Sequence, residues 1–184
     1  MHRPLAATLV AAVSICAIAL PATAEETSPF VAGPAIPDFG PVAAVDIEFP
    51  IPADATFHVR FDVSDSSTPG ELNRRLVTLA RFLNMHAAAG VPEENIALAA
   101  VIHGGATKDM TTAEYFGAET DKENANAPLI AALKEKGVRF YVCGQSAAHY
   151  GVDNEDLLPG VEMALSAMTA HALLDAEGYT LNPF

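Results

Sequence analysis

The cysteine at position 143 lies in a setting that suits thiol chemistry. Around it the sequence reads FYVCGQSAAHYG, an apolar segment followed by Cys143, a glycine and small polar residues that are able to begin a helix. If Cys143 ends a strand and a helix begins directly after it, the free N–H groups and the dipole of that helix stabilise the thiolate, which is the nucleophilic form. The alternative is a small residue buried in the core, a common fate of free cysteine. Spacing alone leaves both interpretations open.

The three residues after the cysteine favour a binding role beside it. Gly144 allows the backbone to turn sharply and to approach a ligand closely. Gln145 and Ser146 carry polar side chains that are able to donate hydrogen bonds to a bound anion or a persulfide. We therefore predict that these residues contribute to a ligand site around Cys143.

A second polar signal, His103-Gly104-Gly105, follows an uninterrupted apolar run over Ile96–Ile102. Such a run is typical of a buried parallel strand, and in parallel sheets ligands collect beyond the carboxyl ends of the strands. If this strand neighbours the one that ends at Cys143, His103 lies near the sulfur, where a cationic imidazole would lower the thiol pKa. We expect Gly104 in the same ligand site. An ordinary hydrogen-bonding role for His103 at a strand end is the alternative.

Other chemistries fit the residues less well. Cys143, His103 and His149 include ligands that suit Cu(I), but their spacing matches no tight metal-binding motif. The segment HGGATK, residues 103–108, lacks the spaced glycines and the Lys-Ser/Thr pair of a phosphate-binding loop. The sequence therefore predicts no resident metal and no cofactor. His149 is expected either to join the ligand site or to face solvent.

The elements that must position these residues alternate between strand and helix. Alternating β-forming residues predict a strand over Thr56–Val63, and Thr68, a proline and Glu71 predict a helix start with a capping box. That helix is expected to end near Gly90. Further strands are predicted at residues 96–102, 138–142, 161–165 and 179–181, and further helices at residues 107–115, 126–136, 146–150 and 167–177. This alternation indicates an α/β fold with a mostly parallel sheet of about five strands that is covered on both faces.

The first residues have the pattern of an export signal. A positive start at Met1–Arg3 precedes an uncharged apolar run, Leu5–Leu20, and small residues up to Ala24. This pattern predicts a signal peptide over residues 1–24, cleaved after Ala24, and a periplasmic protein; an uncleaved anchor is the alternative. Cleavage would remove Cys16, so the exported chain would keep one cysteine and form no intrachain disulfide.

Composition limits the partners and the domain organisation. The chain has 23 acidic and 10 basic side chains and a net charge of −13, which disfavours nucleic acid and, after signal cleavage, membrane surfaces as partners. Residues 25–55 are rich in proline, which we interpret as an extended arm. We expect residues 56–184 to form a single α/β domain.

Several stretches occur in a characteristic order and spacing. They are Phe61-Asp62-Val63, Ala80-Arg81-Phe82-Leu83-Asn84, Val101-Ile102-His103-Gly104-Gly105-Ala106, Cys143-Gly144-Gln145-Ser146, Leu165-Ser166-Ala167-Met168-Thr169-Ala170 and Gly178-Tyr179. Together they resemble the exported branch of the DsrE/DsrF-like family, over roughly residues 39–184. The resemblance implies a three-layer α/β/α fold and homo-oligomers, often trimers or hexamers.

The resemblance also implies a role for the cysteine. In the sulfur-relay members of this family, a cysteine after a central strand carries a persulfide and passes the sulfur to a partner protein. Cys143, Ala147-Ala148 and Gly151 match the layout of those members, so the sulfur-carrier role is carried over to Cys143 alone. The relay members work in the cytoplasm and lack the proline-rich arm, and Tyr150 stands where they often have an arginine.

The leading hypothesis is a periplasmic sulfur-handling protein. In it, Cys143 accepts sulfane sulfur as a persulfide and delivers it to a partner protein or a small thiol, while His103 and the helix start stabilise the sulfur anions. Two alternatives stay open. One is a non-catalytic module that binds a small ligand or a metal, with Cys143 as a structural residue or a ligand, and the other is an oligomeric assembly protein whose arm is exchanged between subunits.

Overall fold

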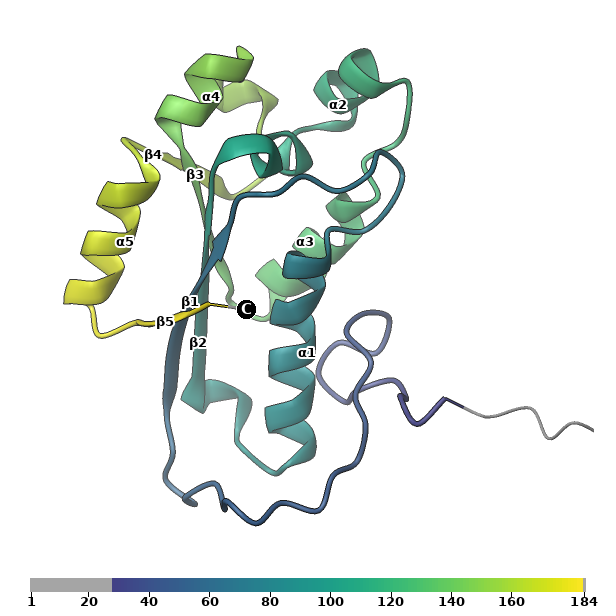
Figure 1. Cartoon of the computed structure of the whole chain (residues 1–184), viewed down its shortest axis with the longest axis vertical. Helices are drawn as coiled ribbons and strands as arrows, with labels where there is room; N and C mark the ends of the chain where they lie inside the picture. Colours follow the sequence, from purple (N-terminus) through teal and green to yellow (C-terminus); the bar gives the residue numbers. More distant parts are fainter. Residues whose placement is uncertain (1–27, 184) are drawn as a thin grey trace, which may run out of the picture.

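The computed structural model of the chain describes residues 28–183, and the predicted signal peptide, residues 1–24, lies outside the described residues. Five strands form one parallel sheet in the order β4-β3-β2-β1-β5. Their bounds are β1 Phe57–Val63, β2 Ile96–Ile102, β3 Arg139–Cys143, β4 Val161–Ala164 and β5 Thr180–Asn182. The predicted α/β fold with a parallel sheet is confirmed (Figure 1).

The register of the central strands brings their carboxyl ends to one edge of the sheet. β1 and β2 pair from Phe57 beside Ile96 to Val63 beside Ile102, and β3 joins β2 with Val142 beside Ile102. β2 is buried along nearly its whole length, as expected for a continuous apolar run in the middle of a parallel sheet. The polar residues that follow β2 and end β3 therefore meet at the same edge.

Helices cover both faces of the sheet and complete the three-layer arrangement (Figure 1). Their bounds are α1 Arg74–Ala88, α2 Ala113–Thr120, α3 Asn126–Glu135, α4 Gly144–Tyr150 and α5 Ala167–Ala176, with 3-10 segments η1 Glu93–Asn95, η2 Gly104–Met110 and η3 Asn154–Asp156. Leu79 of α1 and Leu133 of α3 join the larger core on one face. Leu174 of α5 packs with Val101 on the other face. None of the helices described is long and apolar enough to cross a membrane.

Two of the predicted helix boundaries are wrong. α1 begins at Arg74 rather than after Thr68, because Asn73 is the N-cap and its side chain accepts a hydrogen bond from the Arg75 N–H at 2.9 Å. The segment from Thr68 to Glu71 forms a turn instead, in which the Glu71 N–H donates to the Thr68 carbonyl. The helix predicted over residues 107–115 is replaced by η2 and the start of α2.

A buried carboxylate, Asp109, ties the loop after β1 to the segment after β2. Asp109 is 1% exposed and accepts hydrogen bonds from the backbone N–H and hydroxyl of Ser67, at 2.9 and 2.7 Å, and from the Asn73 amide at 2.7 Å. Asn126 extends the network, because it accepts from the Asn73 N–H and donates to the Ser67 hydroxyl. Charged hydrogen bonds of this kind are strong when buried, so these loops are held firmly at the functional edge.

Part of the proline-rich segment packs against α1 of the same chain. Asn84 of α1 is fully buried and its side chain accepts hydrogen bonds from the N–H groups of Ala35 and Ile36, at 3.0 and 2.8 Å. The same amide donates to carbonyl groups between Ile36 and Gly40. Residues 44–50, in contrast, are exposed. The first half of the segment therefore belongs to the packed structure.

Candidate functional site

Cys143 is the last residue of β3 and directly precedes α4, so the predicted position at a strand end is confirmed. Side chains alternate along a strand, which puts Cys143 on the same face as Tyr141, the face that α5 covers. The residue carries a free thiol and is only 6% exposed. What surrounds the sulfur therefore decides its reactivity.

Hydrogen bonds to the sulfur favour the thiolate. Burial raises the pKa of the Cys143 thiol, but these hydrogen bonds outweigh burial and bring the pKa below its ordinary value. The donors are the backbone N–H groups of Ser146, Ala167 and Gln145 and the hydroxyl of Ser146. Gln145 and Ser146 lie in the first turn of α4, and Ala167 is the first residue of α5. The starts of two helices therefore converge on the sulfur, an arrangement that stabilises a thiolate.

Ser146 joins the cysteine loop to the histidine loop. Its hydroxyl oxygen accepts a hydrogen bond from the Gly104 N–H at 2.9 Å, and the same hydroxyl group helps to lower the pKa of the Cys143 thiol. Gly104 has a φ of 53°, and a Cβ there would lie 3.0 Å from the Ser64 carbonyl oxygen. A left-handed backbone in so narrow a space requires glycine.

Gly144 and Gln145 hold the start of α4 against the junction of β4 and α5. A Cβ on Gly144 would lie 2.8 Å from the Ala164 carbonyl oxygen, so the backbones touch closely. The Gln145 amide donates to the Leu165 carbonyl at 3.2 Å. These two predicted ligand residues therefore also have a structural part in placing the sulfur.

His103 lies beside Cys143 but hydrogen-bonds to Asp62. Because Ile102 pairs with Val142, the next residues on these neighbouring strands are His103 and Cys143, and strands in a sheet lie about 4.8 Å apart. The Nε2 atom of His103 is 3.1 and 3.2 Å from the carboxylate oxygens of Asp62. The structure thus puts His103 and Cys143 at adjacent positions of neighbouring strands and gives His103 a carboxylate partner.

Asp62 binds a second histidine, His171 of α5, whose Nε2 atom is 2.7 Å from its Oδ1 atom. A carboxylate only accepts hydrogen bonds, so the Nε2 atoms of both rings carry the proton, and in a neutral ring Nδ1 is left as a proton acceptor. Burial raises the pKa of the Asp62 carboxyl, but the hydrogen bonds from His171 and His103 outweigh it and hold the pKa below its ordinary value. Asp62 is therefore a carboxylate that orients two imidazoles.

The structure does not bring His149 to this cluster. His149 is exposed in the last turn of α4, and its ring contacts that of Tyr150 with the centroids 4.8 Å apart. Within residues 28–183 no hydrogen bond or ion pair joins it to Cys143 or His103. Across the same residues, no group of three or more His, Cys, Asp and Glu side chains is placed to hold a metal ion. The three residues considered for Cu(I) are thus not assembled.

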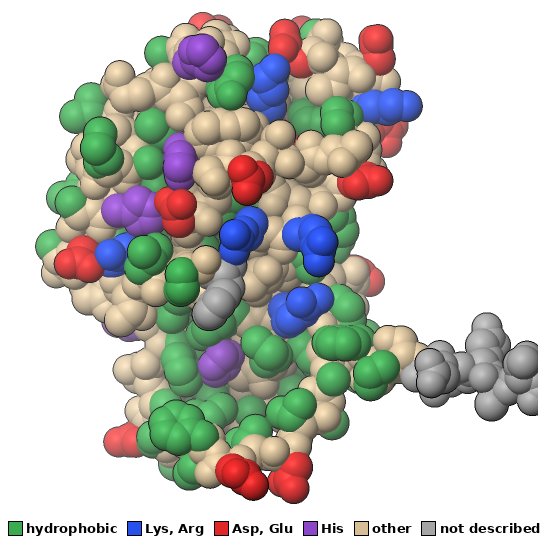
Figure 2. Space-filling model, viewed as in Figure 1, with side chains coloured by type: hydrophobic (Ala, Val, Ile, Leu, Met, Phe, Trp, Pro, Cys, Tyr) green, Lys and Arg blue, Asp and Glu red, His purple; other side chains and the backbone are tan. Residues whose placement is uncertain are grey.

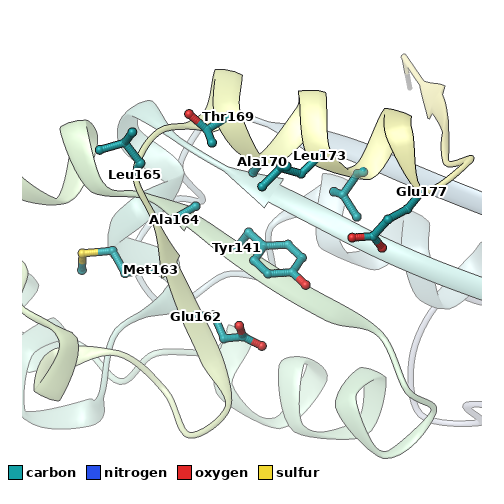
Figure 3. A pocket seen from close by; sticks show the side chains of 10 residues that line it. Tyr141, Glu162, Met163, Ala164, Leu165, Thr169, Ala170, Leu173 and Glu177 are labelled. Carbon is teal, nitrogen blue, oxygen red and sulfur yellow. The ribbon is translucent and has the colours of Figure 1, made fainter.

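A small pocket of about 230 Å³ lies beside the cysteine, between β3, β4 and α5. Figure 3 shows the ring of Tyr141 across its middle, between Glu162 and Glu177. Ala164, which also lines it, is the register partner of Cys143. The pocket therefore lies next to the sulfur without including it, and its volume suits a molecule smaller than most ligands of drug size.

Three contributors to this site were missed from the sequence. Asp62 could have been predicted as a site residue, because it is a charged residue near the carboxyl end of a strand that is otherwise rich in β-formers. His171 and the N–H group of Ala167 reach the site from α5. Their contribution depends on how α5 packs against the sheet, which no local pattern in the sequence records.

Known proteins resemble this chain in sequence pattern and in fold. The model of the DsrE/DsrF-like family matches residues 58–183. Among solved structures, the protein of unknown function MTH1491 from Methanobacterium thermoautotrophicum is similar, with a TM-score of 0.52 and 19% sequence identity over 70% of this chain and 99% of that chain. The ychN protein from E. coli has a TM-score of 0.52 and 13% identity over 70% of this chain and 100% of that chain. At such identities the likeness shows the fold alone. No curated protein matches the chain.

Replacing Ser146 by alanine is expected to raise the pKa of Cys143, because the variant loses the hydroxyl group that helps to lower this pKa and keeps the backbone N–H groups that also lower it. The ultraviolet absorbance of the thiolate, followed against pH, measures this pKa in a chain that also carries Cys16→Ser. The midpoint should move to higher pH, so that less thiolate is present at neutral pH. Ser28→Ala, an exposed change, is the matched control. An unmoved midpoint in Ser146→Ala would contradict the role of the hydroxyl.

Proposed function

The chain belongs to the DsrE/DsrF-like family, and we propose that it is a periplasmic sulfur-handling protein that carries sulfane sulfur as a persulfide on Cys143 and passes it to a partner. The observation that carries the proposal is the convergence of two helix starts on a buried sulfur whose pKa lies below its ordinary value. Donors that stabilise a thiolate also suit a persulfide anion, because both are sulfur anions that accept hydrogen bonds. The family is associated with sulfur relay, which agrees with this use of the cysteine.

Loading in this proposal is a transfer between sulfur atoms. The donor is an organic persulfide or an inorganic polysulfide, and the Cys143 thiolate attacks its terminal sulfane sulfur. A new S–S bond forms to Cys143 while the S–S bond of the donor breaks, and its electron pair leaves with the donor thiolate. Delivery reverses the step, because an acceptor thiolate attacks the outer sulfur and Cys143 leaves as a thiolate. Neither direction needs an external oxidant or reductant.

His103 is the proposed proton acceptor. Asp62 holds the Nε2–H of its ring, which leaves Nδ1 to take the proton of the Cys143 thiol before the attack. The imidazolium that forms is then stabilised by the adjacent carboxylate. His171, bound to the same Asp62 oxygen at 2.7 Å, fixes the carboxylate from the α5 side. Asp62 and His171 are therefore positioning residues for His103.

Polysulfide exposure is expected to increase the intact mass of the Cys16→Ser chain in steps of one sulfur atom, because Cys143 is then its only thiol. The gain should disappear in Cys143→Ser, which the change of one atom leaves folded. His103→Gln should still load at neutral pH but more slowly, by about 10- to 100-fold, since it loses a general base. Circular dichroism checks the fold of each variant.

Two results would contradict this function. One is sulfur loading that persists in Cys143→Ser. The other is a Cys143 that neither gains sulfur nor reacts with an alkylating reagent until the protein is denatured, which would leave the small-ligand module with a structural cysteine as the better interpretation.

The periplasmic part of the proposal rests on the amino-terminal pattern. Expressed with its own first residues in a bacterium that has a periplasm, the chain should appear in the periplasmic fraction with Glu25 as its first residue. Sequencing of the amino terminus measures this. A full-length chain retained in the membrane fraction would instead establish the uncleaved anchor.

A second candidate function, self-assembly, is favoured by an apolar surface beside the site. Leu165, at the junction of β4 and α5, is 73% exposed, and Met168 and Leu173 of α5 are 78% and 61% exposed. Large apolar side chains gathered on one surface are typical of protein interfaces. We propose that a homo-oligomer, a trimer or a hexamer, buries this surface.

Replacing Leu173 by aspartate is expected to reduce the mass of the protein in solution, because a charge in an apolar interface opposes association. Size-exclusion chromatography with light scattering measures the mass. Leu181→Asp, at an exposed position of β5, is the control for the added charge. An assembly that is unchanged in Leu173→Asp, or that is already a monomer without it, would exclude this surface as the interface.

A further inference from the structure

A groove of about 730 Å³ lies on the α1 side of the sheet, between the loop that follows β1 and the exposed face of α1. Its polar lining includes the loop residues Ser66, Ser67 and Thr68 and the helix residues Arg74, Arg75 and Arg81. In Figure 2 basic side chains gather near the middle of the visible face, where Figure 1 has α1. The groove therefore combines hydroxyl groups with a local group of cations.

The three arginines of the groove have no carboxylate partner among the described residues. The ion pairs that Lys and Arg form there are Arg60–Asp175, Lys108–Glu119, Lys136–Glu93 and Arg139–Glu177. Arg75 and Arg81 donate to the backbone carbonyls of Pro183 and Pro41, and the Arg81 guanidinium also lies over the ring of Phe30, 5.8 Å from its centroid. Asp65 and Glu71 also line the groove without pairing with the arginines. In a chain of 23 acidic and 10 basic side chains, it is unusual that three arginines line one groove and that none of them pairs with a carboxylate of residues 28–183.

Two of these arginines lie at a helix start, where a positive charge is unfavourable. Arg74 and Arg75 are the first residues of α1, and the first turn has no acidic residue. A helix start carries the positive end of the dipole and favours anions, so cations there are unfavourable. Neither arginine caps the helix, because the N-cap is Asn73, whose side chain already accepts a hydrogen bond from the Arg75 N–H. Residues that break a local rule in this way are expected where function requires them.

We propose that this groove binds a small organic ligand with two anionic groups. One group contacts Arg74 and Arg75 at the helix start, together with the hydroxyls of the β1–α1 loop, and the other contacts Arg81. Arg74 and Arg81 are separated by about 10 Å along the helix axis, given the rise of an α-helix. Guanidinium groups bind carboxylates and phosphates through paired hydrogen bonds. An elongated dianion therefore uses the whole groove, whereas a single small ion uses one end.

The groove is separate from the sulfur site. It lies on the α1 side, whereas Cys143 is on the face that α5 covers. The proposal therefore does not depend on the sulfur chemistry, and changes to the arginines are expected to leave sulfur loading on Cys143 unaltered.

The test measures the binding of dicarboxylates of increasing length, from succinate to suberate, to the full chain by isothermal titration calorimetry. Suberate should bind more tightly than succinate or inorganic sulfate. Arg74→Gln and Arg81→Gln should each weaken suberate binding by about tenfold or more, the loss expected for one charged hydrogen bond. Lys122→Gln, at an exposed lysine outside the groove, should bind as the unaltered chain does.

Several results would overturn the proposal. They are equal binding by the arginine variants, sulfate binding as tight as that of suberate, and no binding of any dicarboxylate at millimolar concentration. A hexaglutamate peptide that binds more tightly than every dicarboxylate would also overturn it, because the groove would then serve an acidic protein segment. Sulfur loading measured on the same variants separates these outcomes from a failure of the proposed function.

Discussion

The parallel direction of the five strands is the constraint on which the candidate site depends. Because β1, β2 and β3 run the same way and are in register, Asp62, His103 and Cys143 arrive at one edge of the sheet from segments far apart in the chain. Side chains alternate along each strand, so a shift of one residue in β3 would turn Cys143 toward α1 and away from α5. The chemistry therefore rests on register, which the buried residues of β2 enforce by packing on both faces of the sheet.

The sulfur anion at this edge is buried, and burial by itself destabilises an anion. Hydrogen bonds decide the balance, because the N–H groups of two helix starts and the Ser146 hydroxyl outweigh desolvation of the thiolate. Their close approach relies on Gly144, where a Cβ would meet the backbone of β4 at 2.8 Å. The loops themselves are held by the buried carboxylate of Asp109. A firm polar framework is thus what allows the sulfur to be both buried and ionisable.

The sequence predicts those parts of the site that depend on local interactions, and it does not predict those that depend on contacts between distant segments. The strand that ends at Cys143 and the buried run before His103 were predicted, because hydrophobic pattern and glycine positions specify them directly. The start of α1 was not, since Thr68 and Asn73 are both acceptable caps and only the contacts of Asn73 with Asp109 and Asn126 select between them. The link between Asp62 and His171 spans 109 residues, and it exists only after α5 has docked. Local pattern thus predicted where the cysteine lies, and tertiary packing decided what surrounds it.

The two faces of the sheet divide the polar groups of this edge into separate sites. On the α5 face, Asp62 and the helix starts act on Cys143. On the α1 face, Arg74, Arg75 and Arg81 line the groove. The β1–α1 loop contacts both sites. Ser66 lines the groove, and the Ser64 carbonyl oxygen would lie 3.0 Å from a Cβ on Gly104, the residue that is hydrogen-bonded to Ser146. Ser67 of the same loop is bound twice by Asp109, so the loop does not have to move for either site to be occupied. An anion in the groove and a persulfide on Cys143 are therefore compatible in one molecule, each stabilised by charges and donors that the other does not use.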